Sequence, residues 1–137
     1  MPQPGEVLLY TNYIFEDGTE KDKLFVVLNI ADIDVPCFIL QTTSQSKHYK
    51  DVVQGCNPKK KVFFIPKDWE ECFKLSTYIQ LPRIIEIPTK ELLEGTLSKN
   101  IRVIDSLSID CYRKLKNCLK QFKEDISPYH WKLIFKS

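Results

Sequence analysis

The segment VPCFILQTTSQSKHYKD, residues 35–51, joins an apolar run directly to a run of hydroxyl, amide and basic side chains. Its first part, residues 35–43, predicts a buried strand, because it is short, apolar and rich in β-branched and aromatic residues. Pro36 stands near the start of this strand, where proline is tolerated. The polar part that follows predicts either an ordinary surface loop or a binding site at the end of a core strand.

The whole chain has the composition of an ordinary globular domain. Of its 137 residues, 43% are hydrophobic and 28% are charged. The 20 basic and 18 acidic side chains leave a formal charge of +2, so any basic surface has to come from local clustering. No apolar run approaches the roughly 20 residues of a membrane span, and the N-terminus lacks the pattern of a signal peptide. We therefore expect one domain over residues 1–137, located in the cytoplasm and without a membrane partner.

The five cysteines predict buried free thiols. They are odd in number and widely scattered, and no CxxC pair occurs. Cys111 and Cys118 share a helical face at seven-residue spacing, which is not a zinc-ligand pattern. The chain also has only four glycines and no phosphate-binding glycine loop. We therefore expect no metal, no cofactor and a reducing compartment.

Further apolar runs on both sides of the opening segment predict more strands. They lie at residues 5–15, 24–30 and 61–66, with one or two strands at residues 76–88 that Pro82 interrupts. Near the C-terminus the apolar period becomes helical, and Ser108 can cap the start of this helix. The helix is expected at about residues 108–125, with Leu115, Leu119 and Phe122 packed on the strands. Five or six short strands followed by one helix predict an α+β fold, mainly β, shaped as a small curved barrel.

Two polar segments predict one site. One ends at Lys23, before the second strand, and the other begins at Thr42, at the end of the third. If these strands pair in antiparallel fashion, the start of one lies beside the end of the other, so Lys23 approaches Thr42 and Thr43. A cation beside hydroxyl groups suits an anion such as phosphate.

Four longer stretches occur in an order that is similar to a known family. They are PGEVLLYTNYIFEDGTEKDKLFVVLN, FILQTTSQS, FFIPKDWEECFKLSTYIQLPRIIEIPTKELL and LSKNIRVIDSLSIDCYRKLKNCL. In this order the chain resembles the PemK/MazF family of toxin endoribonucleases, which belong to bacterial toxin–antitoxin systems. The resemblance covers about residues 4–122, and the order of the short motifs carries it rather than any single one.

The resemblance implies an SH3-like barrel of the PemK/CcdB type, with five to seven strands and a C-terminal helix. It also implies metal-independent cleavage of single-stranded RNA by transfer to the substrate's own 2′-hydroxyl group. The family's catalytic threonine falls on Thr43, and its catalytic arginine falls on Lys23, which Leu24 follows in place of the family's proline. A lysine keeps the positive charge but not the planar fork of a guanidinium.

The resemblance also suggests the residues and partners that serve RNA cleavage. The side chains expected to bind RNA are Lys21, Thr42, Ser44, Lys47, His48 and Lys50. His48 is in addition a candidate proton carrier, because histidine titrates near neutral pH; no motif of the family contains it, and an ordinary exposed loop histidine is the alternative. The expected partners are a cognate antitoxin and a second copy of the chain. The aromatic tail, residues 128–137, offers apolar surface for a homodimer or covers the chain's own barrel.

Two other functions remain open at this point. The same barrel could be a non-catalytic module that binds protein or nucleic acid, with Lys23 marking a degenerate site. It could also be a toxin directed at a protein target such as a topoisomerase. Cleavage of purified RNA without added metal separates the ribonuclease from both.

Overall fold

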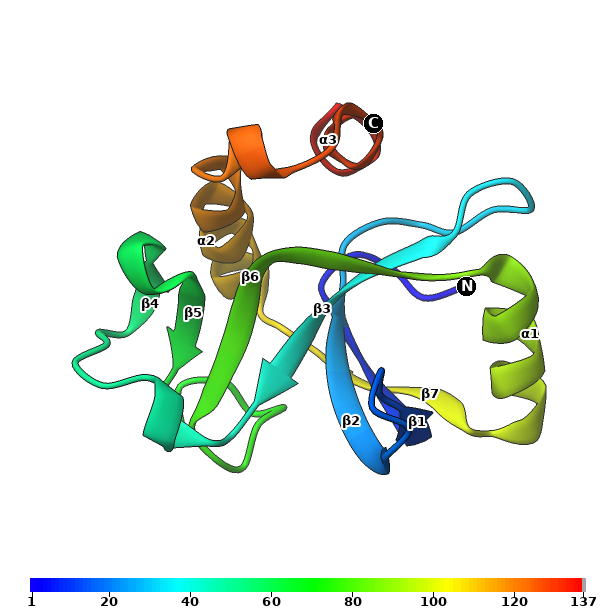
Figure 1. Ribbon diagram of the computed structural model, residues 1–137, viewed down its shortest axis with the longest axis horizontal. Helices are drawn as coiled ribbons and strands as arrows, with labels where there is room; N and C mark the ends of the chain where they lie inside the picture. The colour runs from blue at the N-terminus through cyan, green and yellow to red at the C-terminus, as the bar shows by residue number, and fades with distance from the viewer. Residues whose placement is uncertain (137) are drawn as a thin grey trace.

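The computed structural model describes residues 1–136 and contains, within that range, one seven-stranded antiparallel sheet with the strand order β4-β5-β6-β3-β2-β1-β7 (Figure 1). The strands are β1 (Glu6–Ile14), β2 (Glu20–Val27), β3 (Cys37–Thr43), β4 (Gly55–Asn57), β5 (Val62–Ile65), β6 (Thr77–Ile87) and β7 (Ile101–Ser106). The expected α+β class, mainly β, is confirmed. The sheet is strongly curved but not closed, since β4 and β7 form its two edges and do not pair with each other.

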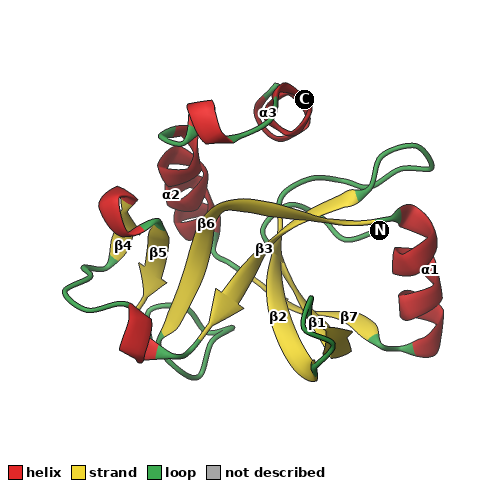
Figure 2. Cartoon of the chain, viewed as in Figure 1, coloured by secondary structure: helices red, strands yellow, loops and turns green. Residues whose placement is uncertain are grey.

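Three α-helices accompany the sheet in the described residues (Figure 2). They are α1 (Thr89–Ser98), α2 (Ile109–Lys120) and α3 (Pro128–Phe135), and short 3-10 turns occur at η1 (Ser46–His48), η2 (Pro58–Lys60) and η3 (Lys123–Asp125). The Ser108 hydroxyl accepts a hydrogen bond from the Cys111 backbone N–H at 3.1 Å, so it caps α2 as expected. The helix ends at Lys120, earlier than expected, and η3 continues the chain. None of these helices is long and apolar enough to span a bilayer.

Apolar side chains cover both faces of the sheet. Along β3, Phe38 and Leu40 belong to a core that includes Leu115 of α2. The alternate residue Ile39 belongs to a second core, which includes Leu92 of α1. Leu115 is 0% exposed, so the expected packing of the C-terminal helix is confirmed. In Figure 1, α2 and α1 accordingly lie at opposite ends of the sheet.

The stretch around Pro82 forms one strand. β6 runs unbroken from Thr77 to Ile87, with a cis peptide bond between Leu81 and Pro82. It pairs with β5 through its first half and with β3 along most of its length. Pro82 therefore does not interrupt the strand.

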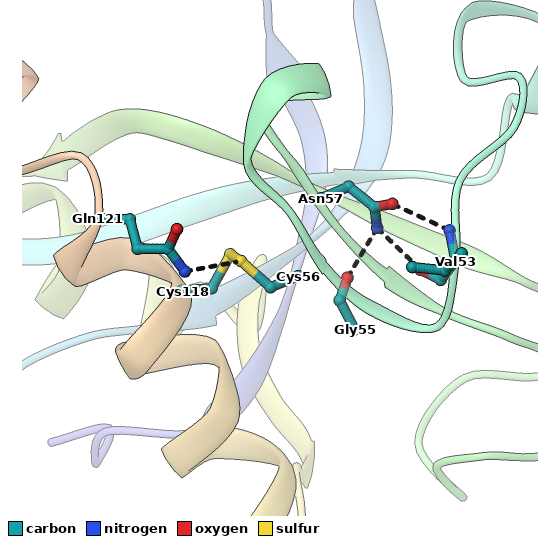
Figure 3. Close-up of a disulfide and its surroundings, with 6 residues drawn as sticks. All are labelled: Val53, Gly55, Cys56, Asn57, Cys118 and Gln121. Carbon is teal, nitrogen blue, oxygen red and sulfur yellow. Dashed lines mark hydrogen bonds between the residues drawn. A yellow bond between two sulfur atoms is a disulfide. The ribbon is translucent and has the colours of Figure 1, made fainter.

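A disulfide between Cys56 and Cys118 corrects the expectation that all cysteines are free thiols (Figure 3). Their Cα atoms lie 5.5 Å apart, and the bond ties β4, at the edge of the sheet, to α2. The two residues are 62 positions apart, so their proximity follows from the tertiary fold and is not visible in the sequence spacing. Cys37, Cys72 and Cys111 are free, and burial raises the pKa of the Cys37 thiol to about 12.

The aromatic tail folds back on its own chain as α3, a helix that was not expected. Ile134 is buried, and Trp131 and Phe135 are half-buried against the core under α2. The His130 ring contacts the Phe38 ring, with centroids 4.5 Å apart, and its Nε2 lies 2.6 Å from a carboxylate oxygen of Glu86. Of the two roles expected for the tail, the structure therefore provides the covering of the chain's own core. Ser137, its last residue, lies outside the described residues.

Candidate functional site

The pairing of β2 with β3 brings the two polar segments together. The strands are antiparallel, and Phe25 lies opposite Gln41 at the last pair before the site. The start of β2 and the end of β3 therefore lie side by side, in the lower half of Figure 1. This is the arrangement that the sequence predicts.

Lys23 and Thr42 hold these two strand ends together. The Lys23 ammonium group donates to the Thr42 carbonyl oxygen at 3.0 Å. The Thr42 hydroxyl donates to the Leu24 carbonyl oxygen at 2.8 Å, and the Thr42 residue is buried. Because its proton is committed to the backbone, Thr42 positions the site and does not donate to a ligand.

Thr43, by contrast, keeps its hydroxyl proton available. Its Oγ1 accepts a hydrogen bond from the Gln45 backbone N–H at 3.2 Å, and the side chain is half-buried. A hydroxyl group donates one proton and accepts through two lone pairs, so Thr43 can still donate to a ligand oxygen.

Lys23 and Thr43 line two cavities that meet at this pair. The first, of about 380 Å³, is lined by Asp22, Lys23, Leu24, Thr42, Thr43, Ser44, Cys72, Phe73, Lys74, Leu75, Thr77 and Ile104. The second, of about 330 Å³, is lined by Phe15, Asp17, Thr19, Lys21, Lys23, Gln41, Thr43, Gln45, His48 and Gln80. The two cavities share only Lys23 and Thr43, so this pair lies where they adjoin; the two cavities together are called the groove.

Lys23 has no acidic partner, although it is partly buried. No ion pair within 4.0 Å involves Lys23 in residues 1–136, and its ammonium nitrogen lies 5.7 Å from the centroid of the Phe15 ring. Burial, and to a lesser extent the charge of Lys21, lower the pKa of Lys23. An incoming anion would relieve both effects, because it compensates the buried charge and screens the neighbouring lysine.

The two carboxylates in the groove are occupied by their own chain. Asp22 accepts a hydrogen bond from the Asn12 backbone N–H at 3.0 Å. Asp17 accepts from the backbone N–H and the hydroxyl of Thr19 at 2.9 and 2.7 Å, and these bonds lower the pKa of Asp17. The lysines of the groove therefore remain available to a ligand.

Most of the side chains expected to bind RNA lie along this groove. Lys21 and His48 line the second cavity, and Ser44 lines the first. Lys47 and Lys50 line neither cavity, and both are exposed. The Lys50 carbonyl accepts a hydrogen bond from the Lys60 ammonium group, which ties the loop after η1 to η2.

Gln80 of β6, which was not expected, lines the second cavity, and an aromatic stack lies next to it. Tyr78 of β6 lies opposite Thr43 in the sheet. Its ring stacks between those of Tyr49 and Phe64, with centroid distances of 5.0 and 4.8 Å. Gln80 donates to the Tyr49 hydroxyl at 3.0 Å and so holds the loop that carries His48. The available sequence signal was Tyr49 itself, an aromatic residue inside an otherwise polar loop.

The described residues contain no group of three or more His, Cys, Asp and Glu side chains arranged to hold a metal ion. The groove offers instead cations, the hydroxyl groups of Thr43 and Ser44, and a histidine, which together suit a phosphate ester. No model of a known protein family matches the chain, and no curated protein matches it at a significant level.

Proposed function

We propose that this chain is the toxin of a toxin–antitoxin pair, an SH3-like barrel of the PemK/MazF type that cleaves single-stranded RNA without a metal ion. The observation that carries the proposal is the meeting of Lys23 and Thr43 in one groove. Lys23 contributes an unpaired, half-buried cation, and Thr43 contributes a hydroxyl proton that no other group uses. Lys23 lies in the first half of β2, which begins at Glu20 and so earlier than expected, and Thr43 is the last residue of β3; these adjacent strands hold the pair in place.

The proposed reaction needs one proton acceptor and two hydrogen-bond donors from the protein. The 2′-hydroxyl oxygen of one nucleotide attacks the neighbouring phosphorus, and the 5′-oxygen of the next nucleotide leaves with a proton from solvent. His48 accepts the proton of the 2′-hydroxyl group. Lys23 and Thr43 donate hydrogen bonds to the non-bridging oxygens, where negative charge increases in the transition state. The products are a 2′,3′-cyclic phosphate and a free 5′-hydroxyl group.

The groove also explains how RNA would be held before cleavage. Lys21 and Lys74 lie on opposite sides of the central pair and suit the flanking phosphates. The half-buried Tyr49 ring, which stacks on Tyr78, is a platform of the kind on which an unstacked base packs. A cognate antitoxin and a second copy of the chain are the partners that we propose for this toxin.

The test is cleavage of a labelled, mixed-sequence single-stranded RNA by the purified protein in excess EDTA. We expect products that end in a cyclic phosphate. Thr43→Val should lower the cleavage rate by about a hundred- to a thousand-fold, as is typical when one preorganised donor is lost. Lys23→Met should do the same. The matched control is Lys47→Met, which removes an exposed cation from the adjacent η1 turn, outside both cavities, and should leave the rate within about twofold of the wild type.

Lys23→Arg separates a working lysine site from a degenerate one. If lysine is the functional residue, arginine changes the rate only modestly. Cleavage by the arginine variant alone would mean that the native chain is a non-catalytic binding module. Growth arrest in cells without any cleavage of RNA would instead favour a toxin directed at a protein.

A further inference from the structure

The C-terminal helices carry a second basic surface, remote from the groove. We define the lysine–aromatic surface as Lys116, Lys120, Lys123, Lys132, Trp131 and Phe135. These residues come from α2, η3 and α3, which lie at the top of Figure 1, whereas the groove lies at the lower ends of β2 and β3. The two surfaces therefore have no residue in common.

The lysines of this surface gather around two neighbouring rings. The centroids of Trp131 and Phe135 are 4.3 Å apart. The ammonium nitrogens of Lys116 and Lys120 each lie 5.6 Å from the centroid of the Phe135 ring, and that of Lys123 lies 5.4 Å from the Trp131 ring. Contacts of this kind are weak at exposed sites, so an incoming ligand can displace the ammonium groups from the rings.

These lysines have no acidic partners in the described structure. Between Ile109 and Lys136 there are seven basic and three acidic side chains, although the whole chain is almost balanced. Asp110 pairs with Arg113 and Lys114, and so does not compensate the lysines of this surface. Within residues 1–136, no ion pair within 4.0 Å involves any lysine of the lysine–aromatic surface. Burial and the charge of Lys120 lower the pKa of Lys116, which is the mark of an uncompensated cluster.

A cavity opens beside the tryptophan. It measures about 470 Å³, and its lining combines the apolar side chains of Ile126, Pro128 and Trp131 with the ammonium-bearing chains of Lys123, Lys132 and Lys136. The floor is therefore apolar and partly aromatic, whereas the rim is cationic. A flat, apolar-faced group with an attached anion matches both parts.

We propose that the lysine–aromatic surface binds single-stranded RNA, with a base stacked on Trp131 and the adjoining phosphates on Lys120, Lys123 and Lys132. An acidic peptide would match the lysines, but it would not use the solvent-accessible part of the half-buried Trp131 and Phe135 rings. Stacking on aromatic rings together with backbone contacts to lysines is how proteins bind single strands without sequence preference. A duplex would not serve, because its bases are already stacked on each other. The choice of RNA over other single strands rests on the proposed function, whereas the binding surface itself does not.

The experiment measures binding without cleavage. The probe is a fluorescein-labelled, 2′-O-methylated uridine dodecamer, which lacks the nucleophilic hydroxyl group and cannot be cut by the proposed reaction. Fluorescence anisotropy gives its Kd at several salt concentrations for Lys120→Gln/Lys123→Gln/Lys132→Gln. The matched control, Lys90→Gln/Arg102→Gln/Lys114→Gln, removes the same charge from exposed positions on α1, on β7 and on the other face of α2.

We expect the first triple variant to bind at least tenfold more weakly, with a salt dependence smaller by about 2 in the log–log slope, since each lost phosphate contact contributes about 0.7 for a single strand. The control should stay within about twofold of the wild type. A Trp69→Phe chain, in which Trp131 is the remaining tryptophan, should show quenched emission when the dodecamer binds.

Three results would overturn the proposal. The first is equal Kd values for the two triple variants, and the second is unchanged Trp131 emission on binding. The third is displacement of the dodecamer by a poly-glutamate that carries the same charge as the dodecamer and is present at a lower concentration. The proposed ribonuclease can fail independently, because its own assay follows cleavage of unmodified RNA. A chain that binds the dodecamer through this surface but cuts no RNA would refute the ribonuclease and retain the binding surface.

Discussion

Reduction of the disulfide should remove a large part of the stability of the fold. The bond between Cys56 and Cys118 closes a loop across 62 positions of the chain. In the chain-entropy description, a loop of this length lowers the entropy of the unfolded state by about 14 cal/mol/K, which corresponds to about 4 kcal/mol at 25 °C. A typical domain has a free energy of unfolding of roughly 5–15 kcal/mol, so the reduced protein should be marginal.

The assay is urea unfolding with and without a reductant, followed by circular dichroism. With a denaturant dependence of about 2 kcal/mol per M, the midpoint should fall by about 2 M on reduction. Cys56→Ser/Cys118→Ser should show the same lowered midpoint in both conditions, and the control Cys72→Ser should behave as the wild type, because Cys72 is a free thiol. Alkylation of the unreduced, denatured chain should modify three cysteines. Five modified cysteines, or equal midpoints, would refute the reasoning.

Four further substitutions probe the core and the groove. Leu115→Ala should lower the free energy of unfolding by about 2–5 kcal/mol, because Leu115 is fully buried between α2 and the sheet; a chemical denaturation midpoint equal to that of the wild type would contradict this packing. Thr42→Val should cost about 1–3 kcal/mol by leaving the Leu24 carbonyl unpaired, whereas Thr43→Val should cost little, and equal losses in thermal melts would be inconsistent with the assigned roles. The pKa of Lys23 is lowered in the folded chain, so the protonated side chain destabilises the fold at pH values below that pKa. The free energy of unfolding should therefore increase as the pH rises through the pKa. Anion binding should be lost over the same pH interval, because Lys23 loses its charge. Lys21→Gln should move the loss of cleavage to higher pH, and an unmoved pH profile would exclude this coupling.

The sequence predicted the strands and the helix whose residues form a long apolar pattern. The strands β1, β2, β3 and β5 contain continuous apolar runs, β6 is rich in β-branched residues, and α2 combines a cap with a helical apolar period. Helix α1 was missed because Leu92 is its only fully buried side chain in the described structure, so no period appears. Helix α3 was missed although Ser127 followed by Pro128 is a helix-start signature, and the Ser127 hydroxyl does accept from the His130 N–H at 3.1 Å.

The site was predictable only to the extent that it depends on neighbouring strands. Antiparallel pairing of consecutive strands places Lys23 beside Thr43, and this follows from chain order alone. Gln80 reaches the groove through the pairing of β3 with β6, and Lys74 reaches it through the loop before β6. Two further strands separate β3 from β6 in the sequence. No local pattern shows that pairing, and the same holds for the disulfide.

The burial of both faces of the sheet has a consequence for folding. In most sheets one face is polar, so a strand that pairs one residue out of step exposes its apolar side chains and is rejected. In β3 such a slip would merely exchange Phe38 and Leu40 with Cys37 and Ile39 between two apolar cores. Hydrophobicity therefore discriminates poorly between the correct alignment of this strand and its nearest misalignments.

Polar groups at the two ends of β3 supply the missing discrimination. At one end the Asn29 side chain accepts from the Phe38 N–H at 2.7 Å and donates to the Pro36 carbonyl at 3.0 Å, and at the other the Thr42 hydroxyl bonds to the Leu24 carbonyl. A one-residue slip breaks all three bonds and leaves buried polar atoms without partners. The hydrogen bonds of Asn29 and Thr42 thus select the correct register of β3 as the chain folds. The proposed catalytic pair depends on that register, because Thr43 is the last residue of β3.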